Sequence, residues 1–230
     1  MKTLIIIPIK NRETELLATV EEVQKNSNGM DFLFIDYGST DRTKYILENN
    51  EINRIQLPLK GTYEDAVGVG IKFAHDNGYD NVIQFDVFKG LSSNDLVYFE
   101  RSMLNNKVDL ILGSRYLEKT NNKIRKRFYI RVLKVAIKIV SKKRVTDPAI
   151  NLRMMNRKVM KVIIENEEWS LTPASISHLL RAGFNFMELQ ITEPNKELRK
   201  KSINKFKLLK YVWFQLLTIL FVQPFRKKVK

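Results

Sequence analysis

Short runs of consecutive apolar residues, each followed by a helix-like pattern, constrain this chain more than any other feature. Their continuous apolar character is typical of strands that are covered on both faces of a sheet. We expect strands at Thr3–Ile7, Asp31–Asp36, Ile52–Leu57, Asn81–Asp86 and Asp109–Leu112, and helices at Glu13–Lys25, Asp41–Glu48, Tyr63–Asn77 and Asn94–Leu104. This alternation predicts an α/β fold with a doubly wound, mainly parallel sheet flanked by helices.

Two of the expected strands end in an aspartate, Asp36 and Asp86. In an open parallel sheet, ligands bind beyond the carboxyl ends of the strands. Carboxylates placed there can hold a ribose or sugar hydroxyl, a base edge, or a metal that neutralises a diphosphate. A tight turn followed by a helix cap explains the run Gly38–Asp41, and Asn11 can cap the helix after the first strand. Neither explanation accounts for Asp36.

Charge divides the chain into two unlike halves. Residues 1–114 hold 12 basic and 17 acidic residues, a net charge of −5, whereas residues 115–230 hold 28 and 8, a net charge of +20. The strongly basic second half is expected to bind a polyanion, which could be nucleic acid, phosphorylated lipid or an anionic membrane. Its aromatic residues form an apolar block instead of alternating with basic ones, which argues against nucleic acid. The chain has no cysteine, so disulfides, thiolate zinc sites and cysteine nucleophiles are excluded.

A basic amphipathic helix is expected at Lys123–Ser141. One side carries Arg127, Arg131, Lys134, Lys138 and Lys142, and another carries Phe128, Val132, Val135 and Ile139. This pattern is typical of a helix that lies on a membrane surface. A packed surface helix with a solvated basic side explains it equally well.

A second apolar segment, Tyr211–Phe225, has basic residues on both sides. Fifteen helical residues span roughly 23 Å, which is less than the roughly 30 Å hydrocarbon core of a bilayer. An in-plane or shallowly inserted helix therefore fits better than a spanning one. The alternative is a terminal helix that covers the core or the interface of a homo-oligomer.

Several motifs, taken together, resemble the family 2 glycosyltransferases, whose nucleotide-binding fold is called GT-A. The matching stretches are Ile5–Glu13, Phe34–Thr43, Gly61–Ala74 and Val82–Asp86. Further matches are similar to the polyprenyl-phosphate branch of dolichyl-phosphate mannose or glucose synthases: Gly113–Tyr116, Val145–Pro148 with Leu152-Arg153, and Gly183–Ile191. The resemblance implies a GT-A domain at 1–203, with a nucleotide-sugar half at 1–114 and an acceptor half at 115–203, followed by a membrane-associating helix at 204–230.

The resemblance also implies roles for particular residues. Pro8, Asn11, Asp36 and Ser39 would bind the nucleotide, Asp86 would hold Mg²⁺ or Mn²⁺, Arg115 would lie near the phosphates, Asp147 and Arg153 would belong to the segment that closes the active site, and Arg127 and Arg131 would bind the lipid phosphate. An arginine suits phosphate because its fork of N–H donors binds two oxygens at once.

Some residues depart from the family pattern. Phe88 stands where the metal motif has its second aspartate, and it could stack on a sugar or simply pack; Arg12 stands where a glutamate is common. Ile150 and Asn151 replace the usual Ser-Gly, and Arg131 stands where serine is frequent. One carboxylate with phosphates and waters can still hold Mg²⁺.

The resemblance implies inverting transfer of a hexose from a GDP- or UDP-linked donor to a polyprenyl phosphate, at the cytoplasmic face of a membrane, by a peripheral or monotopic enzyme. An ionised phosphate acceptor needs no general base, and no acidic pair occurs near Trp169–Ala174, where relatives with hydroxyl acceptors would have one. Two alternatives stay open: a transferase with a saccharide acceptor, and a catalytically silent homologue that binds nucleotide or a partner enzyme.

Overall fold

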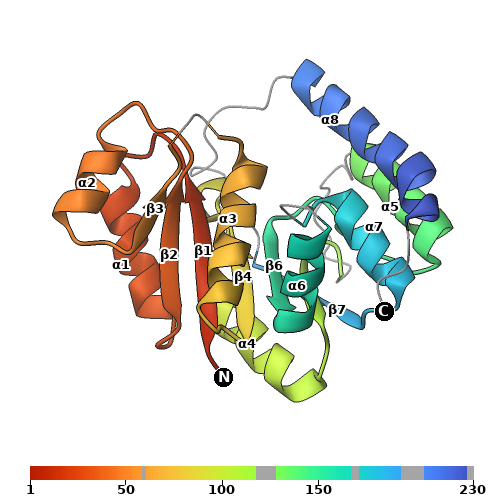
Figure 1. Cartoon of the computed structure of the whole chain (residues 1–230), viewed down its shortest axis with the longest axis horizontal. Helices are drawn as coiled ribbons and strands as arrows, with labels where there is room; N and C mark the ends of the chain where they lie inside the picture. The colour runs from red at the N-terminus through yellow and green to blue at the C-terminus, as the bar shows by residue number, and fades with distance from the viewer. Residues whose placement is uncertain (59–60, 118–127, 167–170, 193–204, 227–230) are drawn as a thin grey trace.

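A seven-stranded sheet forms the centre of the computed structural model, which describes residues 1–58, 61–117, 128–166, 171–192 and 205–226 (Figure 1). From edge to edge the order is β3 (Arg54–Gln56), β2 (Asp31–Asp36), β1 (Thr3–Ile9), β4 (Asn81–Phe85), β6 (Leu152–Asn156), β5 (Leu110–Ser114) and β7 (Phe186–Gln190). Neighbours among the first four strands are parallel, β6 is antiparallel to both β4 and β5, and β7 is parallel to β5. The predicted mainly parallel sheet is confirmed.

Helices cover both faces of the sheet because successive strand side chains point to opposite faces. Leu4 and Ile6 of β1 join one apolar cluster, whereas Ile5 and Ile7 join the other. The second cluster includes α1 (Leu16–Asn26), α2 (Thr43–Asn49) and α4 (Asp95–Asn106); the first includes α3 (Tyr63–Asp76), α5 (Phe128–Ser141), α6 (Arg157–Glu165), α7 (Pro173–Ala182) and α8 (Lys205–Leu217). The predicted α/β architecture is therefore correct.

Gly70 allows α3 to lie close against the sheet. A Cβ atom built on it would lie 2.6 Å from Ile35 Cδ1 and 2.9 Å from Ile6 Cγ2. Both contacts are with fully buried side chains, so the neighbours have little room to move. The glycine is a packing requirement of the first half of the fold.

The strands and helices of the second half were predicted less completely. The prediction missed β6, β7, α6 and α7. In β6 the buried Arg153 interrupts an otherwise apolar run, and β7 is a partly exposed edge strand, so neither shows a continuous apolar pattern. Strand β3 is also shorter than expected, covering only Arg54–Gln56.

Helix α5 confirms the predicted helix and shows which of its residues pack on the protein. It begins at Phe128 among the described residues; the expected start at Lys123 and the candidate Arg127 lie outside them. Ile130, Leu133 and Ile137 pack on the protein. Three apolar residues expected on another side, Phe128, Val135 and Ile139, are 77%, 52% and 63% exposed.

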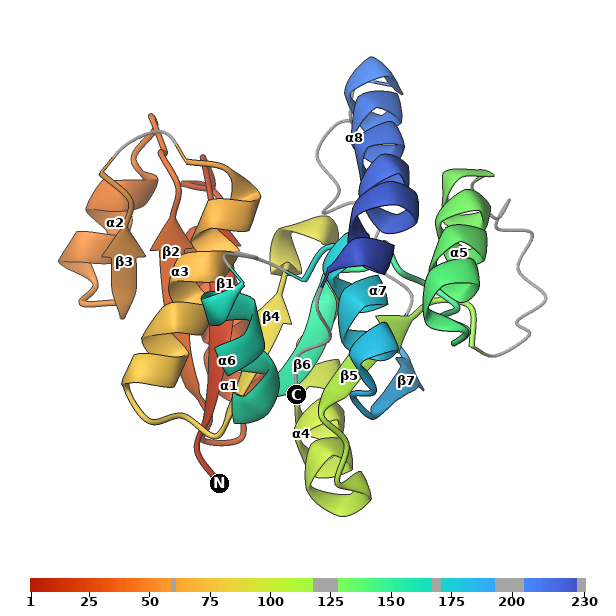
Figure 2. The same ribbon diagram turned by 45° about the vertical axis from the view of Figure 1, so that its right-hand side comes forward.

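Helix α8 begins at Lys205 and is continued by a π-helical turn (Thr218–Val222) and a 3₁₀ turn (Gln223–Phe225). Pro224 accounts for the irregular end, since it has no N–H to donate to the preceding turn. Figures 1 and 2 show α8 beside α5 and α7, away from β1 to β3. The predicted boundary between residues 203 and 204 lies outside the described residues.

Candidate active site

The loops that follow β1 and β2 are hydrogen-bonded to each other. Asn11 receives Thr40 N–H on Oδ1 (2.7 Å) and donates its own N–H to Ser39 Oγ (2.9 Å). Glu13 N–H donates to Asp41 Oδ2 (3.3 Å). The predicted helix cap by Asn11 is wrong: its side chain ties the two loops together, and α1 begins beyond it without a side-chain cap. Both loops are thus held at the carboxyl end of the sheet.

Asp36 is buried at the end of β2 and organises the turn that follows. Its Oδ1 accepts hydrogen bonds from Gly38 N–H (3.1 Å), Ser39 N–H (2.9 Å) and Ser39 Oγ (2.8 Å). Gly38 has a φ of +105°, which favours glycine. Within the described residues, Asp36 Oδ2 is buried and has no hydrogen-bond partner. A buried oxygen of this kind calls for a donor, and a ligand N–H or hydroxyl would supply one.

A cavity of about 150 Å³ opens beside this turn. It is lined by Pro8, Lys10, Arg12, Tyr37, Tyr63, Asp86 and Phe88, which come from the carboxyl ends of β1, β2 and β4 and from the start of α3. The structure therefore brings the predicted Pro8 and Asp86 to one cavity. Asp36 does not line it but lies at the end of β2, the strand next to β1.

Asp86 is the acidic residue of this cavity. It is 4% exposed and receives Asn151 Nδ2 on Oδ2 at 3.3 Å. Burial, and then the charge of Asp86, raise the pKa of Tyr37 to about 12 and the pKa of Tyr63 well above its ordinary value. Both phenols therefore stay protonated at neutral pH and present O–H groups near the carboxylate.

Phe88 follows Asp86 in the 3₁₀ turn Val87–Lys89 and packs under a cation. The Arg12 Cζ lies 5.0 Å from the centroid of the Phe88 ring, which is 8% exposed. In the part of the chain that the structure describes, no three acidic or histidine side chains form a metal-binding group. One carboxylate still meets the minimum that Mg²⁺ uses when substrate phosphates and water complete its shell. Asp86 would hold such an ion, and the ion would neutralise the leaving diphosphate.

Arg115 and Asp147 form a buried ion pair. Arg115 donates from Nε to Asp147 Oδ2 (2.6 Å) and from Nη2 to Oδ1 (2.9 Å). The Asp147 side chain is fully buried, and that of Arg115 is 13% exposed. Burial alone would lower the pKa of Arg115, but the hydrogen bonds and charge of Asp147 outweigh it and raise the pKa. The two predicted residues thus meet, and each holds the other in place.

The segment before Asp147 is fixed by Glu188 of β7. Glu188 accepts hydrogen bonds from Thr146 N–H (2.7 Å) and Thr146 Oγ1 (2.8 Å), and Thr146 Oγ1 also hydrogen-bonds Ser114 Oγ. Burial raises the pKa of Glu188 despite these hydrogen bonds. Three stretches that the sequence indicated separately, around Ser114, Asp147 and Glu188, therefore form one polar network.

Arg153 donates a hydrogen bond to the residue that follows Asp147. It is 3% exposed, and its Nη2 donates to the Pro148 carbonyl oxygen at 2.9 Å. Burial lowers the pKa of its guanidinium. This contact orients the segment that holds Asp147. Substrate binding by Arg153, which the resemblance implies, stays a prediction.

Of the two arginines predicted for the lipid phosphate, only Arg131 belongs to the described part of the chain. Arg127 lies outside the described residues, and Arg131 is exposed on α5. Five residues near Asp86 were missed as site residues: Lys10, Arg12, Tyr37, Tyr63 and Asn151. Tyr37 directly follows Asp36, a signal that was available in the sequence, but the contact between Asn151 and Asp86 joins positions 65 residues apart.

Solved structures with similar folds come from the glucosyl-3-phosphoglycerate synthase of Mycobacterium tuberculosis. Its complex with phosphoglyceric acid is 13% identical with a TM-score of 0.65, covering 95% of this chain and 80% of that one. Its complex with Mn²⁺, UDP and phosphoglyceric acid is 13% identical with a TM-score of 0.67, covering 96% and 79%. At this identity the likeness establishes the fold, GT-A. No curated protein matches the chain.

The family is established by a separate comparison. The family model described as glycosyl transferase family 2 matches residues 4–164, which is more than half of the chain and includes Asp36, Asp86, Arg115 and Asp147. The protein therefore belongs to glycosyl transferase family 2 and is a nucleotide-sugar glycosyltransferase with the GT-A fold.

Proposed function

We propose that this glycosyltransferase transfers a hexose from a GDP- or UDP-linked donor to a polyprenyl phosphate at the cytoplasmic face of a membrane. A phosphate oxygen of the acceptor forms the new bond to the anomeric carbon. The bond from that carbon to the donor diphosphate breaks, and its electron pair leaves with the nucleoside diphosphate. The configuration inverts because the acceptor attacks from the side opposite the leaving group. The acceptor is ionised at neutral pH, so no protein base has to remove a proton.

The donor side of the proposal rests on the edge of the sheet at β1, β2 and β4. The buried Asp36 Oδ2 would accept a donor from the base or ribose, and Lys10 and Arg12 line the cavity that would hold the diphosphate. The similar synthase holds Mn²⁺ with UDP-glucose. We propose that Asp86 holds a divalent cation, Mg²⁺ or Mn²⁺, that neutralises the leaving diphosphate here as well.

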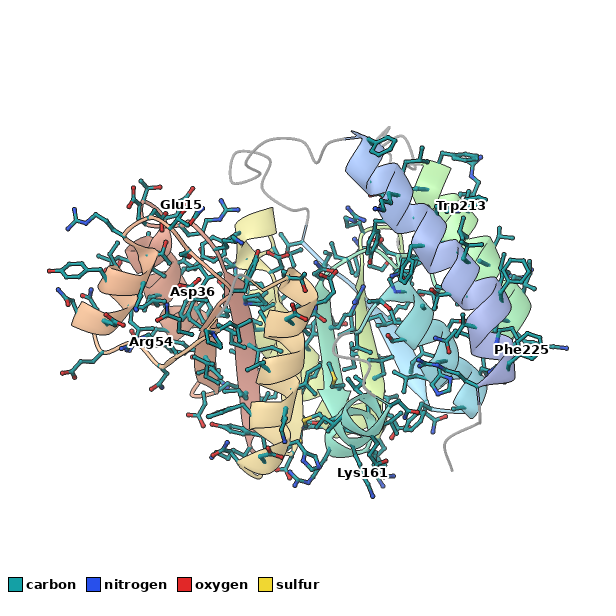
Figure 3. All side chains as sticks on the ribbon, turned by 45° about the horizontal axis from the view of Figure 1, so that its top comes forward. Glu15, Asp36, Arg54, Lys161, Trp213 and Phe225 are labelled. Carbon is teal, nitrogen blue, oxygen red and sulfur yellow. The ribbon has the colours of Figure 1, made fainter. Side chains whose placement is uncertain are left out.

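The observation that carries the acceptor side is the outer surface of α5 and α8. The inner side of α8 packs on the protein through Val212 and Ile219, and Gln215 Oε1 accepts Ala174 N–H at 3.1 Å. Its outer side exposes Leu209, Trp213, Phe214, Leu217, Leu220, Phe221, Val222 and Phe225. Figure 3 shows Trp213 and Phe225 pointing away from the sheet. Leaving this much apolar surface in water is unfavourable, and such patches mark interaction sites.

Basic residues lie beside this apolar surface. On α5 the exposed Arg131 and Lys138 lie near the exposed Val135 and Ile139, and Lys142, Lys143 and Arg144 follow. Each Lys or Arg near an anionic bilayer contributes about 1 kcal/mol of attraction. Apolar side chains bordered by positive charge therefore complement an anionic membrane in both respects.

The geometry favours a helix that lies in the membrane surface. By length and composition, Leu208–Phe225 is one candidate for a membrane span in the described part of the chain, with a mean hydropathy of 1.4. One side of α8 is already packed on α5 and α7, so lipid can reach only the other. Membrane binding then explains why the outer side of α8 is apolar, and packing on the protein core explains why its inner side is apolar.

A donor and acceptor panel tests the function. The full chain is incubated with GDP- and UDP-hexoses, Mg²⁺ or Mn²⁺, and either polyprenyl phosphate in liposomes, phosphoglyceric acid, or a soluble saccharide. We expect transfer to the polyprenyl phosphate alone. Transfer to a soluble acceptor would instead identify the saccharide- or phosphoglycerate-type reaction, and no transfer by a folded, nucleotide-binding protein would identify a silent homologue.

Liposome sedimentation tests the membrane surface separately. Wild type is expected to sediment with anionic vesicles and much less with neutral ones, and a Trp213→Glu and Phe214→Glu double variant should remain in solution. Leu104→Glu, at an exposed position of α4, is the matched control and should sediment as wild type does. Equal sedimentation of all three proteins would contradict the proposed surface.

A further inference from the structure

Two residues that depart from the family pattern, Arg12 and Phe88, pack against each other in the lining of the donor cavity. Phe88 stands where a second carboxylate is expected, and Arg12 stands where glutamate is common. The Arg12 Cζ lies 5.0 Å from the Phe88 ring centroid. A guanidinium on an aromatic face is held by cation–π attraction and stacking. At these two positions, where the family pattern has acidic residues, this protein therefore has a guanidinium that packs on an aromatic ring.

The guanidinium of Arg12 is only loosely neutralised. Within the described residues it forms an ion pair with Glu15, whose Oε1 is 3.8 Å from Nη1, beyond the usual hydrogen-bond distance. The Arg12 side chain is 19% exposed and lines the cavity, so it is fixed in position yet still accessible from the cavity. The backbone N–H of Arg12 donates to Thr43 Oγ1 at 2.8 Å, which fixes the chain at this residue.

The charge of the cavity lining favours an anion even without a metal. Lys10 and Arg12 contribute two positive charges, Asp86 contributes one negative charge, and the two tyrosines are protonated. A cavity with a second carboxylate at position 88 would have no excess positive charge, so it would attract a diphosphate less until a divalent cation bound. Attraction between charges is strong at such short distances and low exposure.

We propose that Arg12, seated on Phe88, binds the donor diphosphate directly and supplies part of the positive charge that a second metal-binding carboxylate would otherwise recruit. The proposal rests on the proposed use of a nucleotide sugar. Its consequence is measurable: a nucleoside diphosphate binds this protein without a divalent cation, and the cation strengthens binding only modestly.

Calorimetric titration of the full chain with UDP and GDP, in EDTA and in Mn²⁺, tests the proposal. We expect wild type to bind one of the two in EDTA with an affinity within about tenfold of that in Mn²⁺. A charged hydrogen bond contributes roughly 1.5–3 kcal/mol, so Arg12→Ala should lower the affinity in EDTA about 10- to 100-fold. Phe88→Asp should lower the affinity in EDTA and make binding strongly dependent on Mn²⁺.

A matched cation–aromatic pair outside the cavity provides the control. Arg42 lies over the Tyr45 ring with its Cζ at 5.6 Å from the centroid, and neither residue lines the cavity. Arg42→Ala should leave the affinity unchanged in both buffers. Circular dichroism and thermal melting of each variant establish that it is folded.

The outcomes separate this proposal from the proposed function. If neither nucleotide binds in either buffer, the use of a nucleotide sugar is refuted. If wild type binds only with Mn²⁺ and Arg12→Ala binds as wild type does, the role of Arg12 is refuted while nucleotide use stands.

Discussion

The buried pair of Arg115 and Asp147 predicts a large and strongly coupled loss of stability. Asp147→Ala removes two short hydrogen bonds, at 2.6 and 2.9 Å, and leaves a guanidinium 13% exposed without its carboxylate. Arg115→Ala leaves a fully buried carboxylate whose remaining hydrogen bond within the described residues is the one from the backbone N–H of position 115, at 3.3 Å. Breaking one side of a buried pair costs about 3–5 kcal/mol, against a total stability of about 5–15 kcal/mol for a typical domain.

The double variant should be much less destabilised than the sum of the single variants. Once both partners are gone, no buried charge is left unpaired, so we expect a coupling of about 1–3 kcal/mol. Urea denaturation of wild type, both single variants and the double variant measures this cycle. The solvent-exposed pair Lys72 and Asp76, at 2.8 Å, is a matched control, and its cycle should show a far smaller coupling because water screens both groups.

Additive losses at Arg115 and Asp147 would refute the reasoning. Values that add within about 0.5 kcal/mol are typical of sites that do not interact. A second result would also count against it: single variants that unfold at the same urea concentration as wild type would show that the pair is not shielded from water.

Three further predictions concern packing, metal binding and pH. Gly70→Ala places a Cβ 2.6 Å from Ile35 Cδ1, so it should cost about 1–3 kcal/mol in urea denaturation; an unchanged midpoint would contradict the close contact. Asp86→Ala should abolish hexose transfer in Mn²⁺, whereas Phe88→Asp should preserve or raise it; a fully active Asp86→Ala variant would show that the metal assignment is wrong. Glu188 has a pKa raised by burial above its ordinary 4.5, so the folded state takes up this proton more readily than the unfolded state. As the pH falls from neutral towards 4.5, wild type should therefore gain stability relative to Glu188→Gln, and a pH-independent difference between the two would refute this shift.

The sequence predicted the first half of the fold because each strand there is an uninterrupted apolar run. β1, β2 and β4 are covered on both faces, so burial alone determines their pattern. β6 was missed for the opposite reason: its buried Arg153 is tolerated only because it reaches the Pro148 carbonyl, a contact made in the folded state. Periodicity cannot reveal such a partner.

The candidate site was predicted at its strand ends and missed where tertiary contacts decide. Asp36 and Asp86 follow directly from their strands. The contact between Arg12 and Phe88 joins positions 76 residues apart in the sequence, and no local pattern indicates it. The sequence also could not predict that Val135 on α5 is exposed. Periodicity shows which residues share a side of a helix but not which side packs on the protein.

The reversed direction of β6 has a consequence for how the active edge is supplied with residues. In a wholly parallel sheet, only the segments that follow strands arrive at the carboxyl-end edge. Because β6 runs the other way, Leu152 at its beginning pairs with Phe85 at the end of β4. The segment that precedes β6 is thereby brought to the same edge, where Asn151 contacts Asp86 and Asp147 contacts Arg115. A single inverted strand thus lets a segment that precedes a strand contribute a side chain next to Asp86.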